Sequence, residues 1–280
     1  MVTMSAIWDR TAEVLRGRGS MLAGIAALLL FLPAVVQDAV SAHVGTTPAA
    51  LGLAGLVGIV VVLMAIWGNL ALVAAAGEPP IDRQAAFAVA ARRLGPAIGL
   101  TVLVGLVVML AAVPGLAMLG IGLGPSASRL TTLTVDGAAT LAAGASPGLI
   151  LAGSLYLFLF ALAVFWLGAR LALSLPVLVN ERRGLRSVAR SFELTRRLTW
   201  RIIGVILLAL ILLLVALSAA QFVFTVIARL LLGAGGVSTA QFVGAVAGAA
   251  VTAGATVVSS TFVAQLYRVV SGREAAYAFA

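Results

Sequence analysis

The side chains of this sequence that could do chemistry are mostly arginines, and they are densest between residues 182 and 201. The candidates there are Arg186, Arg190, Glu193, Arg196, Arg197, Trp200 and Arg201. Guanidinium groups bind phosphate and carboxylate groups through paired hydrogen bonds. We therefore expect this segment to contact anionic phospholipid headgroups or a protein partner at a membrane.

Three further polar residues, Asn69, Arg170 and Gln265, interrupt apolar sequence, each following Gly or Ala and preceding Leu. Polar side chains at membrane depth are costly and often line a substrate or ion pathway. The alternatives are structural. Arg170 can extend its guanidinium group to the headgroups, and the two amides can form hydrogen bonds between helices.

Residues for other kinds of chemistry are scarce. The sequence has no cysteine, and His43 is its one histidine. It contains no phosphate-binding glycine loop, zinc-binding motif or serine-hydrolase motif. Because no nucleophile is paired with a base, an intramembrane enzyme is disfavoured. We expect no catalytic residues, no metal site and no cofactor.

The composition points to a lipid environment for the elements that carry these residues. Of 280 residues, 62% are hydrophobic and 10% are charged, whereas soluble domains average about 45–50% and about 25%. The net charge is +9, which in a soluble protein would suggest nucleic-acid binding. Here the arginines lie at the ends of apolar segments, so we expect no nucleic-acid partner.

Six segments are apolar and long enough to cross a membrane, for which about 20 residues are needed. They cover residues 20–42, 51–76, 96–123, 148–176, 200–232 and 240–270. Pro33 and Pro114 lie inside two of them and predict kinks. The first segment could instead be a signal peptide that is cleaved near Ala42. The acidic residues Asp9 and Glu13 before it argue against cleavage.

The arginines also predict an orientation. Fifteen of the eighteen lie in the N-terminal segment, the loops 77–95 and 177–201 and the C-terminal tail, whereas Arg129 and Arg229 lie on the opposite side. Because cytoplasmic loops carry the excess of basic residues, both termini are expected in the cytoplasm. We expect a multi-pass protein of the bacterial cytoplasmic (inner) membrane.

Short amphipathic stretches precede the first, third and fifth apolar segments, at residues 4–18, 81–94 and 182–199. In the last stretch, Leu185, Val188, Ala189 and Phe192 share one helix face, and the charged residues share another. Such helices lie in the membrane interface with the apolar face towards the acyl chains.

The order of these elements predicts an all-α polytopic membrane protein with six transmembrane helices in three hairpins. Each hairpin is preceded by an interfacial helix, and the whole chain forms one membrane domain. The three pseudo-repeats cover about residues 1–78, 79–181 and 182–280. In the sixth span, Gly244, Gly248, Thr252, Thr256 and Ser260 form a stripe of small residues, which favours close helix packing.

Residues 187–205 resemble a recurring element of a bacterial family, the membrane domain of glycerophosphoryl diester phosphodiesterase. The matching positions are Arg190, Ser191, Phe192, Glu193, Leu194, Thr195, Arg196, Trp200 and Arg201. The family commonly has Gly where this chain has Arg197. The resemblance implies a six-span membrane domain. The family's phosphodiesterase is a separate soluble barrel, and its activity is not expected of this chain.

The sequence thus favours a non-enzymatic integral membrane protein that engages anionic phospholipids or a membrane partner through its arginine-rich interfacial helix. The alternative is a channel or transporter for a small solute or a lipid. Its polar site would lie at the cytoplasmic ends of the even-numbered spans, at Asn69, Arg170 and Gln265.

Overall fold

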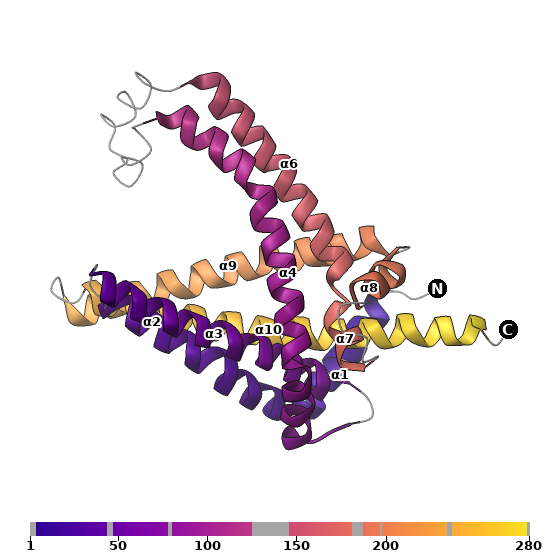
Figure 1. Ribbon diagram of the computed structural model, residues 1–280. Helices are drawn as coiled ribbons and strands as arrows, with labels where there is room; N and C mark the ends of the chain where they lie inside the picture. Colours follow the sequence, from indigo (N-terminus) through magenta and orange to yellow (C-terminus); the bar gives the residue numbers. More distant parts are fainter. Residues whose placement is uncertain are drawn as a thin grey trace. The chain divides into compact units, whose positions relative to one another are not determined.

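The computed structural model describes residues 4–43, 47–77, 80–124, 146–180, 187–196, 198–233 and 237–278, some by their backbone alone (Figure 1). Within these ranges the chain is helical and contains no β-strand. The elements are α1 (Met4–Ala26), the π-helical turn η1 (Ala27–Phe31), α2 (Leu32–His43), α3 (Pro48–Ala75), α4 (Arg83–Leu123), α6 (Pro147–Leu171), α7 (Ser174–Asn180), α8 (Ser187–Thr195), α9 (Thr199–Leu232) and α10 (Val237–Ala278).

The described residues contain six helical segments that are long and apolar enough to cross a membrane. They are Met4–Ala42, Pro48–Ala75, Arg83–Leu123, Pro147–Asn180, Thr199–Leu232 and Thr239–Gly272. Each contains one of the six segments predicted from the sequence, except that Ala76 of the second lies one residue beyond its span. The prediction of an all-α, multi-pass membrane protein is therefore confirmed. Large apolar side chains along these helices are exposed, among them Leu208, Leu212 and Phe222 of α9. A soluble monomer rarely exposes so much contiguous apolar surface, whereas a lipid bilayer favours it.

Local sequence accounts for several helix ends and irregularities. Thr47 caps α3 by accepting a hydrogen bond from the Ala50 amide at 3.3 Å, and Pro48 occupies the first turn. Gly233 ends α9 with φ +70°, a conformation that side chains disfavour. The π-helical turn η1 lies just before Pro33, where proline removes a backbone donor and crowds the preceding turn.

The predicted interfacial stretches differ from one another in the structure. Residues 4–18 and 81–94 do not form separate short helices, because α1 and α4 run continuously from them into the apolar segments. Gly95 and Pro96 do not interrupt α4, since an unpaired backbone is costly in lipid and the helix is therefore retained. The third stretch does contain a separate helix, α8.

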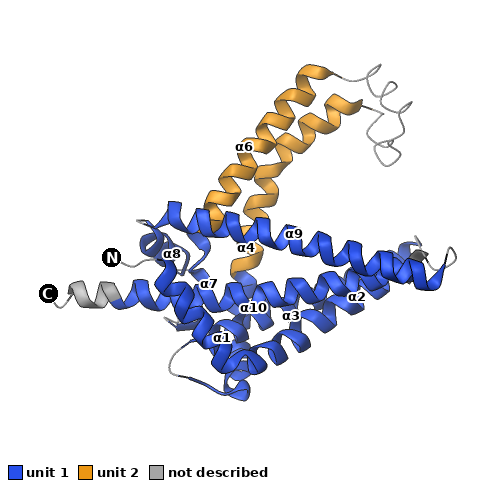
Figure 2. Cartoon of the chain, turned by 180° about the vertical axis from the view of Figure 1, so that it is seen from behind, with its two compact units in different colours: residues 1–99, 170–280 blue, residues 100–169 orange. Residues whose placement is uncertain are grey.

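The chain divides into two compact units (Figure 2). Unit 1 comprises residues 1–99 and 170–280, and unit 2 comprises residues 100–169. Both divisions fall inside or at the end of a helix, at Leu100 in α4 and Arg170 in α6. The units therefore do not follow the predicted repeat boundaries, and the threefold repeat and the hairpins stay predictions.

In unit 1, α10 lies at the centre and contacts α1, α2, α3, α7 and α9. A cluster of buried apolar side chains fills the space between α1, α3 and the beginning of α4, with Leu178 of α7 and Val257 of α10. Its largest members are Leu22, Ile25, Leu29, Leu70 and Leu72, and its smallest are Ala86, Ala90 and Ala97. The alanines allow the helix backbones to approach closely.

The stripe of small residues on α10 packs against other helices at Gly244, Gly248 and Ser260, whereas Thr252 in its middle is exposed. A Cβ atom at Gly244 would lie 2.9 Å from the Gln221 carbonyl oxygen of α9, and one at Gly248 would lie 3.1 Å from Leu217. Further along the stripe, the Ser260 hydroxyl donates to Asn69 Oδ1 of α3 at 3.4 Å. The stripe therefore joins α10 to two neighbouring helices.

Unit 2 is held by a similar close approach between the second part of α4 and α6. A Cβ atom at Gly115 would collide with Tyr156 and Leu157 of the facing helix, and Cβ atoms at Gly122 and Gly153 would make tight contacts of 3.0 Å with it. The Tyr156 hydroxyl donates to the Ala111 carbonyl oxygen at 2.8 Å, one turn before Pro114. This side chain supplies a donor where proline disturbs the helix backbone.

Candidate functional site

The helix α8 is attached to the end of α6 by its small hydroxyl side chains. The Ser191 hydroxyl donates to the Arg170 carbonyl oxygen at 2.6 Å, and Arg170 Nη1 donates to the Phe192 carbonyl oxygen at 3.1 Å. The Arg170 guanidinium also lies over the Phe192 ring, 5.7 Å from its centroid. Arg170 is thus a joint between α6 and α8.

The face of α8 that packs against the protein is its hydroxyl face. Ser187, Ser191, Leu194 and Thr195 are buried, whereas Ala189 is exposed and Val188 and Phe192 are only partly covered. The hydroxyl face packs there because the Arg170 carbonyl offers an acceptor that Ser191 can reach. The apolar stripe is therefore left partly uncovered.

The charged face of α8 is exposed at Glu193 and mostly covered at Arg190. Arg190 and Glu193 form an ion pair at 3.1 Å, and their side chains are 23% and 65% exposed. Exposed pairs of this kind contribute about 0–1 kcal/mol. Arg196 and Arg201 are exposed, and Trp200 is 82% exposed. The structure does not describe Arg186 or the side chain of Arg197, so these two candidates lie outside the described residues.

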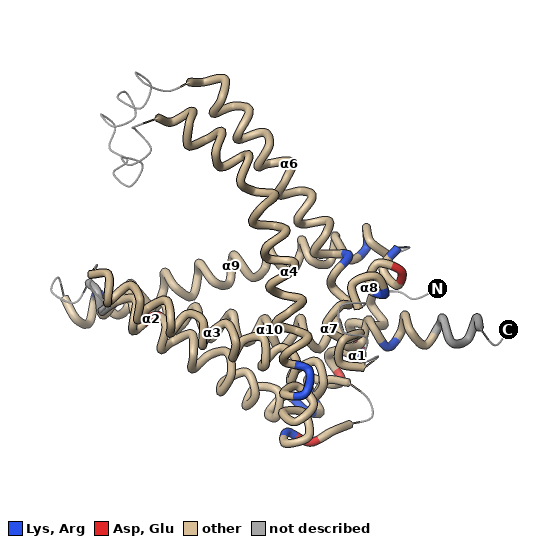
Figure 3. The backbone as a smooth tube through the Cα atoms, viewed as in Figure 1, with Lys and Arg blue, Asp and Glu red and all other residues tan. Residues whose placement is uncertain are grey.

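Charged residues are unevenly distributed over unit 1. Figure 3 shows the described arginines and acidic residues gathered around α1, α8 and the beginning of α4. The long apolar stretches of α2, α3 and α9 that run away from this region carry almost no charge in this view, and Arg229 lies in the last turn of α9. This is the distribution expected of helices whose charged ends meet water and headgroups.

The three polar residues proposed to line a pathway are not brought together. Asn69 donates to the Ala65 carbonyl oxygen of its own helix at 2.9 Å and accepts from Ser260. Gln265 is 1% exposed and donates to the Ala76 carbonyl oxygen at 2.9 Å. Both amides therefore join α3 to α10, whereas Arg170 contacts α8.

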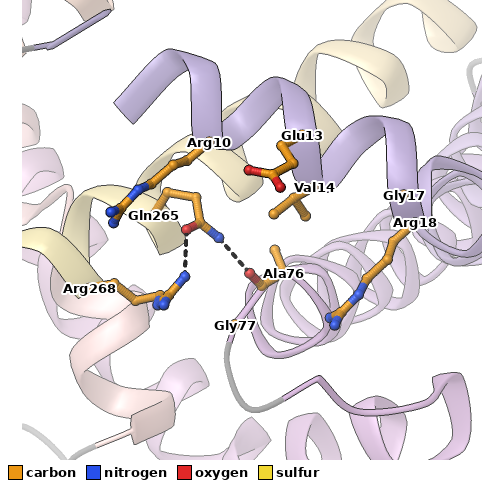
Figure 4. A pocket seen from close by; sticks show the side chains of 9 residues that line it. All are labelled: Arg10, Glu13, Val14, Gly17, Arg18, Ala76, Gly77, Gln265 and Arg268. Carbon is orange, nitrogen blue, oxygen red and sulfur yellow. Dashed lines mark hydrogen bonds between the residues drawn. The ribbon is translucent and has the colours of Figure 1, made fainter. Parts of the chain in front are cut away.

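A polar cavity of about 360 Å³ lies beside Gln265, between α1, α10 and the end of α3 (Figure 4). Its lining consists of Arg10, Glu13, Val14, Gly17, Arg18, Ala76, Gly77, Gln265 and Arg268. Neither Asn69 nor Arg170 is part of this lining. The cavity is thus a feature separate from the polar pathway that the sequence suggested.

The C-terminal end of α3 forms part of the wall of this cavity. Arg18 Nη1 donates to the Ala75 carbonyl oxygen at 3.1 Å, next to the bond between Gln265 and Ala76. Arg268 Nη1 donates to Gln265 Oε1 at 3.0 Å. Arg18 and Gln265 thus donate to the carbonyl oxygens of Ala75 and Ala76 at the end of α3, where carbonyl groups have no partner within the helix. The positive charge of Arg18 also suits the helix C-terminus.

Arg10, Glu13, Arg18 and Arg268 were not predicted from the sequence as site residues. A signal for the α1 residues is nevertheless present, because 10, 13, 14, 17 and 18 follow the spacing of one helix face. Their partners Gln265 and Arg268 come from the other end of the chain, and spacing along the sequence does not reveal that contact. Among the described residues, no group of three or more His, Cys, Asp or Glu could hold a metal ion.

Comparison with known proteins gives one match. Residues 149–271 match the family model of the membrane domain of glycerophosphoryl diester phosphodiesterase. No curated protein and no solved structure matches the chain. The matched residues run from the beginning of α6 into the last part of α10 and include α8. The resemblance carried by Arg190 to Arg201 is thus confirmed over residues 149–271, and it is a resemblance to the membrane domain of that family rather than to its phosphodiesterase.

Proposed function

We propose that this chain is a non-enzymatic membrane domain that engages anionic phospholipids through α8 and the first turn of α9. The observation that carries the proposal is the orientation of α8. Its hydroxyl face is bound to Arg170, which leaves Ala189, Glu193 and the following Arg196 exposed.

The uncovered surface has the chemistry of an interfacial helix. Arg196 and Arg201 are exposed cations, and Trp200 adds an exposed aromatic ring of the kind enriched at headgroup level. Each arginine near an anionic leaflet contributes about 1 kcal/mol of attraction. In the proposed orientation, α8 and both termini lie on the cytoplasmic side of a bacterial inner membrane, as the fifteen arginines of that side favour.

The alternative function, a channel or transporter, has less support. Its candidate residues Asn69 and Gln265 use their amides to hold α3 against α10. Arg170 uses its guanidinium group to hold α8. These hydrogen bonds account for the presence of the three polar residues in apolar sequence, and no substrate pathway is needed to explain them. Lipid engagement is therefore the function that we propose.

The proposal is tested by the lipids that copurify with the protein. We expect the double variant Arg196→Gln/Arg201→Gln to retain at least about fivefold less phosphatidylglycerol than the unmodified chain, since it loses two headgroup-facing charges. Mass spectrometry of the purified protein in mild detergent gives the ratio of phosphatidylglycerol to phosphatidylethanolamine.

The matched control is Arg16→Gln/Arg92→Gln, which removes two other exposed arginines and the same net charge. It should change that lipid ratio by less than about twofold, because it leaves α8 intact. Equal losses in both double variants would mean that total charge, and not α8, attracts the lipid. That result would overturn the proposal.

A further inference from the structure

The cavity at the end of α3 carries an excess of positive charge. Three guanidinium groups line it, from Arg10, Arg18 and Arg268, against the single carboxylate of Glu13. A cleft lined mainly by charges of one sign focuses their field and raises the local concentration of counter-ions. A cavity that gathers three arginines from two helices therefore calls for an anionic occupant.

We propose that this cavity binds a phosphate group, with Arg10 and Arg268 as its principal ligands. Arginine suits phosphate because its planar guanidinium group donates two parallel hydrogen bonds. Arg268 is held in place by its hydrogen bond to Gln265, and Gln265 is fixed in turn by Ala76. One ligand is therefore oriented before the phosphate binds, which lowers the entropic cost of binding.

The shape of the cavity agrees with this occupant. Arg10, Glu13 and Arg18 approach from α1, Gln265 and Arg268 approach from α10, and Ala76 and Gly77 form one wall (Figure 4). Its volume of about 360 Å³ is within the size range of small-molecule sites, about 300–1,000 Å³. Gly17 and Gly77 carry no side chain that would narrow it.

The cavity lies where three candidate spans meet the charged side of unit 1. Gln265 belongs to the span Thr239–Gly272, Ala76 follows the span Pro48–Ala75, and Arg18 lies early in the span Met4–Ala42. A phosphate at this depth can come from a lipid headgroup or from a soluble phosphate compound. Both sources present the same group to the arginines, and the experiment below separates them.

This site is independent of the proposed role of α8, because none of its lining residues belongs to α8. The test uses the full chain in phosphatidylcholine nanodiscs and isothermal titration with two probes, inorganic phosphate and dihexanoyl phosphatidic acid. Chloride at the same ionic strength gives the baseline. We expect saturable binding of at least one phosphate probe above this baseline.

Two variants of α1 should change the affinity in opposite directions. Arg10→Gln removes a ligand and should weaken binding about three- to tenfold. Glu13→Gln removes the opposing carboxylate and should tighten binding by a similar factor. Both side chains are exposed, so neither change should disturb the fold.

The matched controls are Arg16→Gln and Asp9→Asn, which make the same charge changes at exposed α1 positions outside the cavity. Each should alter the affinity by less than about twofold. Comparable binding of both probes identifies a soluble phosphate compound as the source, and much tighter binding of the lipid identifies a headgroup. Absence of saturable binding, or equal effects of Arg10→Gln and Arg16→Gln, would overturn the proposal.

The α8 double variant Arg196→Gln/Arg201→Gln should bind both probes as the unmodified chain does. A loss of copurifying anionic lipid together with normal titration would leave α8 as a lipid contact and the cavity as a separate site. Normal lipid retention together with lost titration in Arg10→Gln would support the cavity and contradict the role of α8. The two proposals can therefore fail separately.

Discussion

Gln265 shows how one buried amide can serve two polar groups at once. Its nitrogen donates to the Ala76 carbonyl oxygen, and its own oxygen accepts from Arg268. Ala76 and Gln265 are each 1% exposed. The Ala76 carbonyl therefore has little access to water, and it depends on Gln265 for a side-chain donor at the end of α3.

We expect Gln265→Leu to destabilise the protein by about 1–3 kcal/mol. Leucine fills a similar volume but leaves a buried carbonyl oxygen without this donor. Denaturation by sodium dodecyl sulfate in mixed micelles, followed by circular dichroism, measures the free energy of unfolding. Gln84→Leu is the matched control, because Gln84 is exposed. A loss no larger in Gln265→Leu than in the control would show that the hydrogen bond is not a stabilising contact.

Among the helices, the close contact between α9 and α10 rests on glycines whose roles differ. A Cβ atom at Gly244 would press against Thr225 Oγ1 and the Gln221 carbonyl oxygen, whereas one at Gly254 would meet nothing within 4 Å. The backbone oxygen cannot rotate away as a side chain can. Gly244 is therefore required by the packing, and Gly254 is not.

This difference predicts that alanine at these two positions of α10 changes the stability of the protein in different ways. Gly244→Ala should destabilise the protein by about 1–3 kcal/mol through overpacking. Gly254→Ala should be neutral or should stabilise it by up to about 1 kcal/mol, since alanine favours a helix. The same detergent unfolding assay measures both. If both substitutions stabilised the protein, the contact between α9 and α10 would be less close than described.

The helix α8 shows what a periodic pattern can and cannot predict. Its spacing predicts a charged face and an apolar stripe, and a separate short helix, Ser187–Thr195, lies within the predicted stretch. The pattern does not indicate that a third face, with Ser191 and Thr195, is the one that packs against the protein. That choice depends on the Arg170 carbonyl, which is a tertiary partner.

At the scale of the whole molecule, the six spans could be predicted because membrane crossing depends on local length and apolarity. The continuity of α1 and α4 through the predicted interfacial stretches could not be predicted in this way. An unpaired backbone is costly in lipid, so α4 stays helical across Gly95 and Pro96. The arginine-lined cavity was also missed, since it joins Arg10 and Arg18 to Gln265 and Arg268 from distant parts of the sequence.

The central claim is that α8 lies in the membrane interface, with its uncovered apolar stripe towards the acyl chains and its charged face towards the headgroups. The chain has no cysteine, so Val188→Cys and Glu193→Cys each give one site for a nitroxide spin label. Val188 is partly covered and Glu193 is exposed, and five residues of helix place them about 140° apart, on the apolar stripe and the charged face of α8.

The direct measurement is the collision rate of each label with oxygen, which concentrates in lipid, and with a water-soluble nickel chelate. It is made by electron paramagnetic resonance in vesicles of phosphatidylcholine and phosphatidylglycerol. We predict that the label at position 188 collides more with oxygen, and that the label at position 193 collides more with the nickel chelate. Preference for the nickel chelate at both positions would place α8 in water and contradict the account.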